Sequence, residues 1–394
     1  MLKRKDKLLV IILIIVVAAL IWIMWRQSHL DYATYLKQSG PGVDSTAEGE
    51  SSGEITLPET YTEKVNDRLY FDAKIITGED FDPNQVYQAS ARIYFPDAEA
   101  WAPVLLQKDL SEYEYEEMDS QGLREIPGKI KSWNDELSDY LRLEVEGIYY
   151  WKQPQMNCMS GLFHFDIPDP MNNQKVFESI DAVDGMDRRT AWENALAQIG
   201  KAGVDTGDWT YDTCLAVNSE TLNDQQQKLV ESGNIEEDDL TLDWGEADEG
   251  YYYYFYQQCN GLMIYPALSV LDYGGAYSHG QLYMSRSGIY ELNIPALFEV
   301  SVSDEVQPLC DFQTIADTLK NHYELYVTNT YLTVTECHLV EYPIQTGENQ
   351  YQMQPIWICK TEEYMGAEAS NTAIDILAVN AVTGEEMTEL EGYN

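Results

Sequence analysis

The order of hydrophobic and polar positions divides the chain into one long apolar run followed by patterned segments. Residues 8–25 form eighteen positions without a charge. As a helix they span about 27 Å, close to the hydrocarbon thickness of a bilayer. Beyond this run, apolar residues recur at every second position or at i, i+3, i+4 and i+7, which indicates strands and amphipathic helices. The chain is therefore predicted to be α+β, with an N-terminal transmembrane helix followed by modules of antiparallel sheet and helix.

The apolar run is interpreted as an uncleaved anchor with a cytoplasmic N-terminus. Four basic residues precede it, and such residues stay on the cytoplasmic side of a membrane. Trp22 and Trp25 lie at its far end, where indole rings favour the interface. A signal peptide is the main alternative, but the run is long for one and no small-x-small cleavage site follows Trp25. We expect a single-pass cell-membrane protein whose residues 1–30 form a cytoplasmic tail and anchor, with the remaining domains extracellular.

Composition separates a spacer from three folded regions in the exterior part. Residues 31–60 are rich in Gly, Ser, Thr and Glu, which bury too little apolar surface to fold, so a flexible spacer is predicted. Periodic segments then predict a first α+β domain over 61–170, a second module over 171–300 and a third over 301–394.

Capping residues and apolar periodicity predict the elements of these regions. Helices are predicted over 97–105, 132–140, 192–199, 221–231 and 312–319. Strands are predicted over 69–75, 86–95, 143–151, 251–256, 261–271, 281–292, 325–342, 350–360 and 372–382. A helix followed by strands occurs in both the second and the third region, and residues 265–270 resemble residues 354–359. Duplicated modules are therefore expected.

Two short runs carry a resemblance to a known family. Pro355-Ile356-Trp357-Ile358 and the run 378–385 resemble the closing hairpin of PepSY-like domains. Behind one anchor, the layout over 180–390 is also similar to YycH/YycI-type regulators of a Gram-positive sensor kinase and to clostridial surface proteins. Asn380 stands where the family more often has Asp. The resemblance implies a non-catalytic extracytoplasmic module that binds or restrains a protein or peptide partner, and it brings no catalytic residues.

The exterior part is strongly acidic, which excludes one class of partner. Residues 27–394 contain 19 Lys and Arg residues against 66 Asp and Glu residues, a net charge of −47. Such a surface repels nucleic acid and anionic lipid and attracts cations or basic partners. We therefore expect no nucleic-acid partner.

The sequence contains no recognisable catalytic or cofactor motif. It has five histidines, no Gly-x-Ser-x-Gly and no His-Glu-x-x-His, so neither a nucleophile elbow nor a zinc hydrolase site is indicated. We expect a binding or regulatory protein of an envelope sensor or wall process, without a cofactor and not an enzyme. The alternative is a carbohydrate-binding protein or an enzyme acting on wall polysaccharide, because spacing alone does not pick out a catalytic carboxylate pair among 67 acids.

An acidic segment is the best metal candidate. Eight carboxylates lie within residues 236–249, and such oxygen ligands suit calcium. The candidate ligands are Asp238, Asp239, Asp243, Glu246 and Asp248. A solvated acidic loop is the alternative that we favour, because charge runs are common on surfaces of such net charge.

Residues 251–256 place aromatic rings on both faces of one predicted strand. One face must pack inward, and the other could stack on a sugar or a peptide. The candidate binding residues are Tyr251, Tyr252, Tyr253 and Tyr254. The alternative that we favour is a central strand covered on both sides.

Two of the six cysteines are predicted to be neighbours. Residues 346–350 have the Gly and Asn of a short hairpin loop. With Glu348 as the centre of a three-residue loop, Cys337 lies directly opposite Cys359, at a separation near that of a disulfide. A register shift of one residue would send the two side chains to opposite faces. We expect Cys337 and Cys359 to lie close together and to form a disulfide, with two reduced thiols as the alternative.

Overall fold

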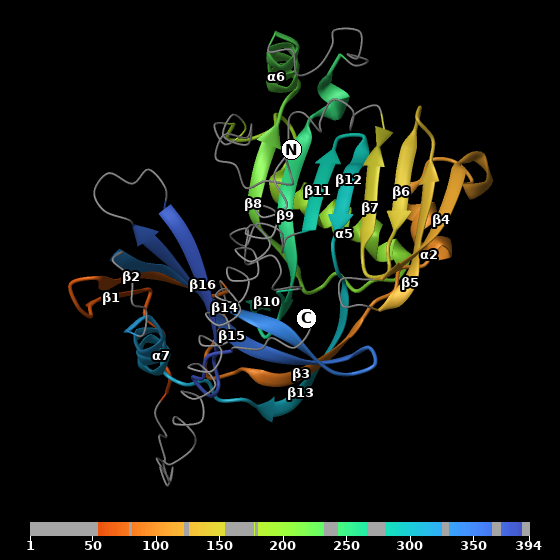
Figure 1. Ribbon diagram of the computed structural model, residues 1–394. Helices are drawn as coiled ribbons and strands as arrows, with labels where there is room; N and C mark the ends of the chain where they lie inside the picture. Colours follow the sequence, from red (N-terminus) through yellow and green to blue (C-terminus); the bar gives the residue numbers. More distant parts are fainter. Residues whose placement is uncertain are drawn as a thin grey trace, which may run out of the picture. The chain divides into compact units, whose positions relative to one another are not determined.

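The computed structural model describes residues 54–78, 81–121, 126–153, 177, 180–231, 243–265, 280–324, 331–364 and 372–387 (Figure 1). The predicted anchor and most of the predicted spacer lie outside these ranges. Within them, none of the helices has the length and apolar character needed to cross a membrane. The described residues form two β-sheets with few helices, so the predicted α+β class is confirmed in a sheet-rich form.

The first sheet joins strands from the two ends of the described chain. Its order is β1-β2-β14-β15-β3-β13, with β16 paired to β15. The strands are β1 (Thr60–Lys64), β2 (Leu69–Ile76), β3 (Tyr87–Ile93), β13 (Phe298–Val306), β14 (Tyr331–Gly347), β15 (Gln350–Tyr364) and β16 (Thr372–Asn380). β2 and β14 run parallel, and the other pairs are antiparallel. Helix α7 (Phe312–Glu324) buries Phe312, Ile315 and Leu319 against this sheet.

The second sheet has nine strands, and its pairs are antiparallel. Its order is β10-β9-β11-β12-β7-β6-β5-β4, with β8 paired to β9. The strands are β4 (Glu114–Gln121), β5 (Pro127–Asn134), β6 (Asp139–Leu143), β7 (Ile148–Lys152), β8 (Trp209–Val217), β9 (Gly250–Cys259), β10 (Leu262–Met263), β11 (Gly280–Ser285) and β12 (Gly288–Ile294). The predicted strand 261–271 is described only up to residue 265.

Two helices cover one face of the nine-stranded sheet (Figure 1). They are α2 (Ala98–Leu105) and α5 (Arg188–Ile199), and both join one hydrophobic cluster with Leu141 and Tyr150 of the sheet. α5 begins where Asp187 accepts a hydrogen bond from the backbone N–H of Thr190 (2.8 Å), as an N-cap does. A third helix, α6 (Ser219–Glu231), contributes Leu222 to a separate cluster on the other face.

The predicted helix over 132–140 is wrong, because these residues form the end of β5, a turn and the start of β6. Trp133 pairs with Leu141 across this hairpin, and both side chains are buried. Ser132 and Asp135 have the spacing of a capping box, on which the helix prediction rested. In the structure Asp135 instead accepts a hydrogen bond from the N–H of Leu137 (3.0 Å) within the turn. Burial of the cross-strand pair outweighs the local capping signal.

The sheets do not follow the predicted boundaries at residues 170 and 300. β1, β2 and β3 join strands of the predicted third region, whereas β4 to β7 join strands of the predicted second region. The predicted first domain is therefore divided between two sheets. Periodicity reports which face of a strand is buried, but it does not specify which distant strand becomes its neighbour.

Asn260 connects the two sheets at the turn between β9 and β10. It lies at positive φ (55°), a conformation that asparagine tolerates better than most residues. Its amide accepts from the N–H of Tyr87 (3.2 Å) and donates to the carbonyl oxygen of Tyr87 (2.8 Å). It also donates to Oε1 of Glu341 (2.8 Å). One side chain thus ties β9 to both β3 and β14.

Candidate functional site

The predicted aromatic strand is β9, and it lies between β8 and β11. Tyr251, Tyr252 and Tyr253 are almost fully buried, and Tyr254 is half-buried. The hydroxyl of Tyr251 accepts from the N–H of Val183 (3.2 Å) and donates to the carbonyl of Met186 (2.8 Å). The covered-strand alternative therefore describes the first three tyrosines, and their predicted role as exposed binding residues is wrong.

Among the described acids of the calcium candidate, Asp248 is held by protein donors. Oδ1 of Asp248 accepts from the hydroxyl of Tyr290 (2.7 Å), and Oδ2 accepts from the N–H of Gly245 (2.9 Å). Asp243 and Glu246 are exposed. Within the described ranges, no group of three or more His, Cys, Asp or Glu residues is placed to hold a metal ion. Asp238 and Asp239 lie outside these ranges, so calcium binding there stays a prediction.

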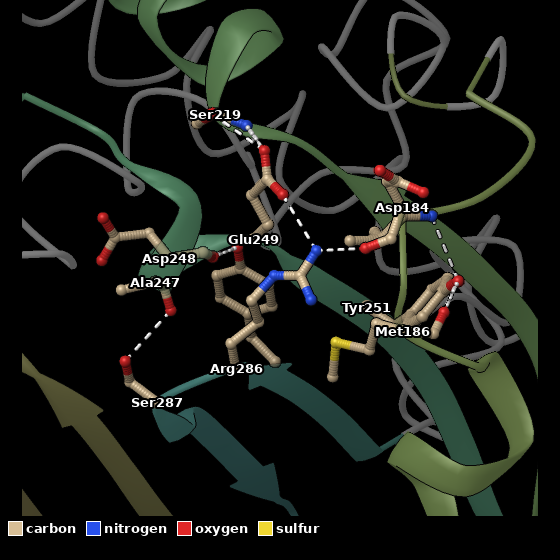
Figure 2. Close-up of polar contacts among 11 residues, drawn as sticks. Asp184, Met186, Ser219, Ala247, Asp248, Glu249, Tyr251, Arg286 and Ser287 are labelled. Atoms are coloured by element: carbon tan, nitrogen blue, oxygen red, sulfur yellow. Dashed lines mark hydrogen bonds and ion pairs between the residues drawn. The ribbon is translucent and has the colours of Figure 1, made fainter.

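Glu249, next to that segment, has a structural role in the same region. It accepts hydrogen bonds from the N–H (3.2 Å) and hydroxyl (2.9 Å) of Ser219 and pairs with Arg286 at 3.3 Å (Figure 2). Burial alone would raise the pKa of Glu249, but the Ser219 hydrogen bonds and the Arg286 guanidinium together lower it. These contacts join the start of α6 to β9 and to the β11–β12 turn.

The predicted cysteine register is confirmed. Cys337 lies directly opposite Cys359 in the β14–β15 ladder, and both side chains are fully buried. Both are free thiols in the structure. Burial, together with the neighbouring Cys337 thiol, raises the pKa of Cys359 well above its usual value. The disulfide itself stays a prediction.

Each of the two described histidines lies beside a carboxylate. Nδ1 of His322 lies 3.0 Å from Glu386, and Nε2 of His338 lies 3.4 Å from Glu336. His29, His164 and His279 lie outside the described residues. Both described histidines are on the seven-stranded sheet or its helix, away from the strands that carry the site described next.

A second face of the nine-stranded sheet, opposite α2 and α5, carries aromatic and polar side chains in adjacent rows. Directly opposed residues share a face, so the strand register defines each row. One row is Tyr252, Tyr283, Glu291, Trp151 and Tyr140. The next row is Tyr254, Gln281, Asn293, Tyr149 and Arg142. We call these ten residues the aromatic face.

The aromatic face has a closed half and an open half. In the closed half, over β8, β9 and β11, Tyr252 and Tyr283 pack with Leu222 of α6 and with Trp244. In the open half, over β6 and β7, the side chains are half-buried, namely those of Tyr140, Arg142, Tyr149 and Trp151. α2 and α5 lie on the opposite side of these strands.

The open half contains a stacked aromatic pair beside side-chain amides. The rings of Tyr140 and Trp151 stack with centroids 4.2 Å apart. The indole N–H of Trp151 donates to Gln153 (3.3 Å), whose amide donates to Asn134 (2.6 Å). These hydrogen bonds fix the indole in place on the sheet.

Arg142 is the cation of the open half. Its guanidinium forms an ion pair with Glu144 and lies 6.0 Å from the centroid of the Tyr149 ring. Its charge is therefore balanced by a carboxylate two residues further along the chain.

Glu291 lies at the boundary between the two halves, and one of its oxygens lacks a partner. The residue is 4% exposed, and Oε2 accepts no hydrogen bond. Within the described part of the chain, Glu291 takes part in no ion pair. Burial raises its pKa to about 8, and the neighbouring Tyr252 hydroxyl acts in the opposite direction. A buried carboxyl of this kind can accept a donor or balance a cation.

Asn293 adds a second acceptor on the same strand and face. Its Nδ2 donates to Oε1 of Gln281 (3.2 Å), while its Oδ1 is buried without a partner. The two unpartnered oxygens belong to residues two positions apart on β12, so both point to the aromatic face.

Sequence reasoning identified Tyr252 and Tyr254 but missed the centre of the aromatic face. One signal was present: Glu291 and Asn293 interrupt the apolar run 289–294. A charged residue inside an otherwise apolar strand is rarely buried unless it has a partner or a role.

Comparison with known proteins informs the fold alone. No protein-family model matches the chain, and no curated protein sequence matches it. The structure is similar to that of an uncharacterized protein from Eubacterium rectale, with a TM-score of 0.58 and 17% sequence identity. The similarity covers 85% of this chain and 95% of the other. The two chains therefore share a fold.

Proposed function

We propose that this chain is a membrane-anchored extracytoplasmic protein that acts by binding a protein or peptide partner, without catalysing a reaction. Its partner belongs to an envelope sensor or a wall process. The apolar run of residues 8–25 and its basic flank support the location. The open half of the aromatic face is the surface where the partner binds.

One observation carries this proposal: the two faces of the nine-stranded sheet differ. α2 and α5 cover one face, whereas the open half of the other presents half-buried Tyr140, Tyr149 and Trp151. A sheet face that only contacts water normally carries polar residues. Aromatic rings beside polar groups are typical of binding surfaces.

The polar groups of the aromatic face support binding rather than catalysis. Its ten residues include a single carboxyl, that of Glu291, and neither histidine nor cysteine. Nucleophilic catalysis needs a nucleophile beside a base, and glycosidases need two carboxyls that flank the reacting bond.

We also propose that residues 171–300 and 301–394 contain duplicated PepSY-like units. α5 is followed by the antiparallel strands β8, β9, β11 and β12, and α7 is followed by β14, β15 and β16. Each helix packs against strands that follow it in the chain. This shared order supports duplication of one helix-and-sheet unit.

Carbohydrate binding is the second candidate, and the stacked Tyr140–Trp151 pair favours it. Sugars bind to flat aromatic surfaces beside amide groups, and Gln153 and Asn134 supply such amides here. Under this alternative, purified wall polysaccharide binds the chain, and Trp151→Ala abolishes the binding.

Photocrosslinking in the intact bacterium tests the proposed function. p-Benzoylphenylalanine replaces Tyr140 in the open half or, as a matched control, half-buried Tyr70 of β2. We expect the same envelope protein to be captured repeatedly from position 140 and not from position 70. Equal capture from both positions, or capture of glycan alone from position 140, would contradict the proposal.

A further inference from the structure

We infer that the partner inserts a cationic group, an ammonium or guanidinium on an apolar stem, into the aromatic face, with Glu291 as its counter-ion. A lysine or arginine side chain of a peptide has this chemistry. The inference rests on the proposed function and specifies the ligand chemistry of the same face.

The first argument is the pair of unpartnered acceptors. Oε2 of Glu291 and Oδ1 of Asn293 are both buried without a hydrogen-bond donor. A buried acceptor without a hydrogen bond is destabilising, and more so if it is charged. Two such acceptors on adjacent same-face positions of β12 are therefore suited to a species that offers several N–H donors, as ammonium and guanidinium do.

The second argument is charge. Burial favours the neutral form of the Glu291 carboxyl. A cation beside the carboxyl stabilises its ionised form, which a water molecule does not. The rings of Tyr283 and Trp151 flank Glu291 in its row, and aromatic faces attract cations. The net charge of −47 outside the anchor draws basic ligands toward the protein.

The third argument is the position of Glu291 in its row. On one side, Tyr283 is fully buried in the closed half. On the other side, Trp151 and the neighbouring Tyr149 are half-buried in the open half. A ligand stem lying over Tyr149 and Trp151 therefore brings its terminal cation to the carboxyl from the open half.

Glu291 titrates nearer to neutral pH than the groups that face it. Tyr252, Tyr283 and Tyr149 face it from β9, β11 and β7, and burial raises the pKa of each above its usual value. Arg142 faces the same side from β6 and is paired with Glu144. Without ligand, burial keeps Glu291 protonated to about pH 8. Binding of a cation ionises it, and the proton leaves to solvent.

The test uses a matched pair of probes and the full-length chain in detergent micelles. Nα-acetyl-lysine methylamide carries the ammonium, and Nα-acetyl-norleucine methylamide has the same stem without it. Binding is followed by fluorine NMR of 5-fluorotryptophan-labelled protein, with the Trp151 signal assigned from Trp151→Phe. We expect a saturable shift of that signal with the lysine probe and none with the norleucine probe.

Two variants separate Glu291 from general charge attraction. Glu291→Gln removes the counter-ion, and we expect binding of the lysine probe to weaken at least tenfold, because a charge-assisted hydrogen bond is lost. Glu116→Gln removes an equal charge from exposed β4, and we expect binding as in the wild type. Equal weakening in both variants, or wild-type affinity in Glu291→Gln, would overturn the inference.

A calorimetric measurement on the wild-type protein tests the inference without depending on whether Glu291→Gln folds correctly. In the wild-type protein, binding of the lysine probe at pH 7 should release close to one proton, measured from the dependence of binding heat on the buffer's ionisation enthalpy. Binding without proton release would overturn the inference. If binding occurs without proton release and crosslinking from position 140 persists in Glu291→Gln, the proposed function stands while the inference fails.

Discussion

Glu291 lies directly opposite Trp151 across the β12–β7 ladder, where the buried tyrosines of the sheet give way to half-buried rings. The pair joins a buried carboxyl with one unpartnered oxygen to a half-buried aromatic ring. The strand register alone produces this arrangement, because opposed residues on antiparallel strands share a face. The proposed binding surface is thus part of the nine-stranded sheet.

Glu291→Gln should change how stability depends on pH. Burial raises the pKa of Glu291 from 4.5 to about 8. As the pH rises, the carboxyl therefore loses its proton at a lower pH in the unfolded state than in the folded state. The free energy of unfolding of the wild type therefore falls between about pH 4.5 and pH 8. Between pH 5 and pH 8.5, ionisation of Glu291 should lower the free energy of unfolding of the wild type by roughly 2–4 kcal/mol, and Glu291→Gln should lack this decrease.

Urea unfolding of both proteins at several pH values measures this difference. Glu116→Gln, with an equal change in net charge, should follow the wild type. Parallel pH profiles for the wild type and Glu291→Gln would contradict the assignment.

Asn260→Gly should destabilise the protein more than Asn349→Gly. Both asparagines lie at positive φ, and each clamps one end of β3 through two backbone hydrogen bonds, Asn260 at Tyr87 and Asn349 at Ile93. Only Asn260 also donates to buried Glu341. We expect an additional loss of about 1–3 kcal/mol for Asn260→Gly.

The difference between the two glycine variants should grow with pH. Burial raises the pKa of Glu341 to about 7, and the Asn260 amide lowers it. Without that amide the folded-state pKa rises further, so the free energy of unfolding of Asn260→Gly should fall more steeply as the pH rises to 7 and above. Denaturant midpoints of the two variants at pH 6 and pH 8 decide this, and an equal difference at both would count against it.

Oxidation should join Cys337 to Cys359. The two lie directly opposite each other, near the separation that a disulfide requires. Mild oxidation, followed by blocking of free thiols and peptide mapping, should give one peptide pair linked through these residues. Recovery of both cysteines in blocked form after oxidation would contradict the prediction.

Residues 8–25 should keep the protein in membranes after washing at high salt. The apolar run is long enough to span the hydrocarbon core, and salt does not release such an anchor. Protease added outside intact spheroplasts should digest the chain beyond about residue 30, in keeping with the positive-inside tendency. Protection of the C-terminal domains would contradict this topology.

Local signals in the sequence predicted the elements that depend on local physics. The spacing of Trp192, Ala195 and Ile199 predicted the helix at 192–199, which in the structure begins at Arg188, and the apolar face of Phe312, Ile315 and Leu319 predicted α7. The pairing of Cys337 with Cys359 matches the prediction from the short loop, although the hairpin closes at Gly347 opposite Gln350, with a register shift between Gln345 and Gly347. In each case capping, periodicity or turn chemistry acts within a few residues.

Long-range pairing could not be predicted in the same way. The insertion of β14 between β2 and β15, and the pairing of β7 with β12, depend on strands far apart in the chain. Glu291 was missed for the same reason, since its neighbours Tyr283 and Trp151 become visible only through the registers. The tyrosines of β9 were identified as aromatic, but their burial depends on β8, β11 and α6.

The pH dependence of lysine-probe binding tests the central claim most directly. A group with a pKa of about 8 is ionised to about 3% at pH 6.5 and about 75% at pH 8.5. The ammonium of the probe stays charged over this range. The affinity of Nα-acetyl-lysine methylamide for the wild type should therefore rise roughly twentyfold between these pH values, with no comparable rise for Glu291→Gln. An affinity that is independent of pH in the wild type, or that rises equally in the variant, would contradict the account.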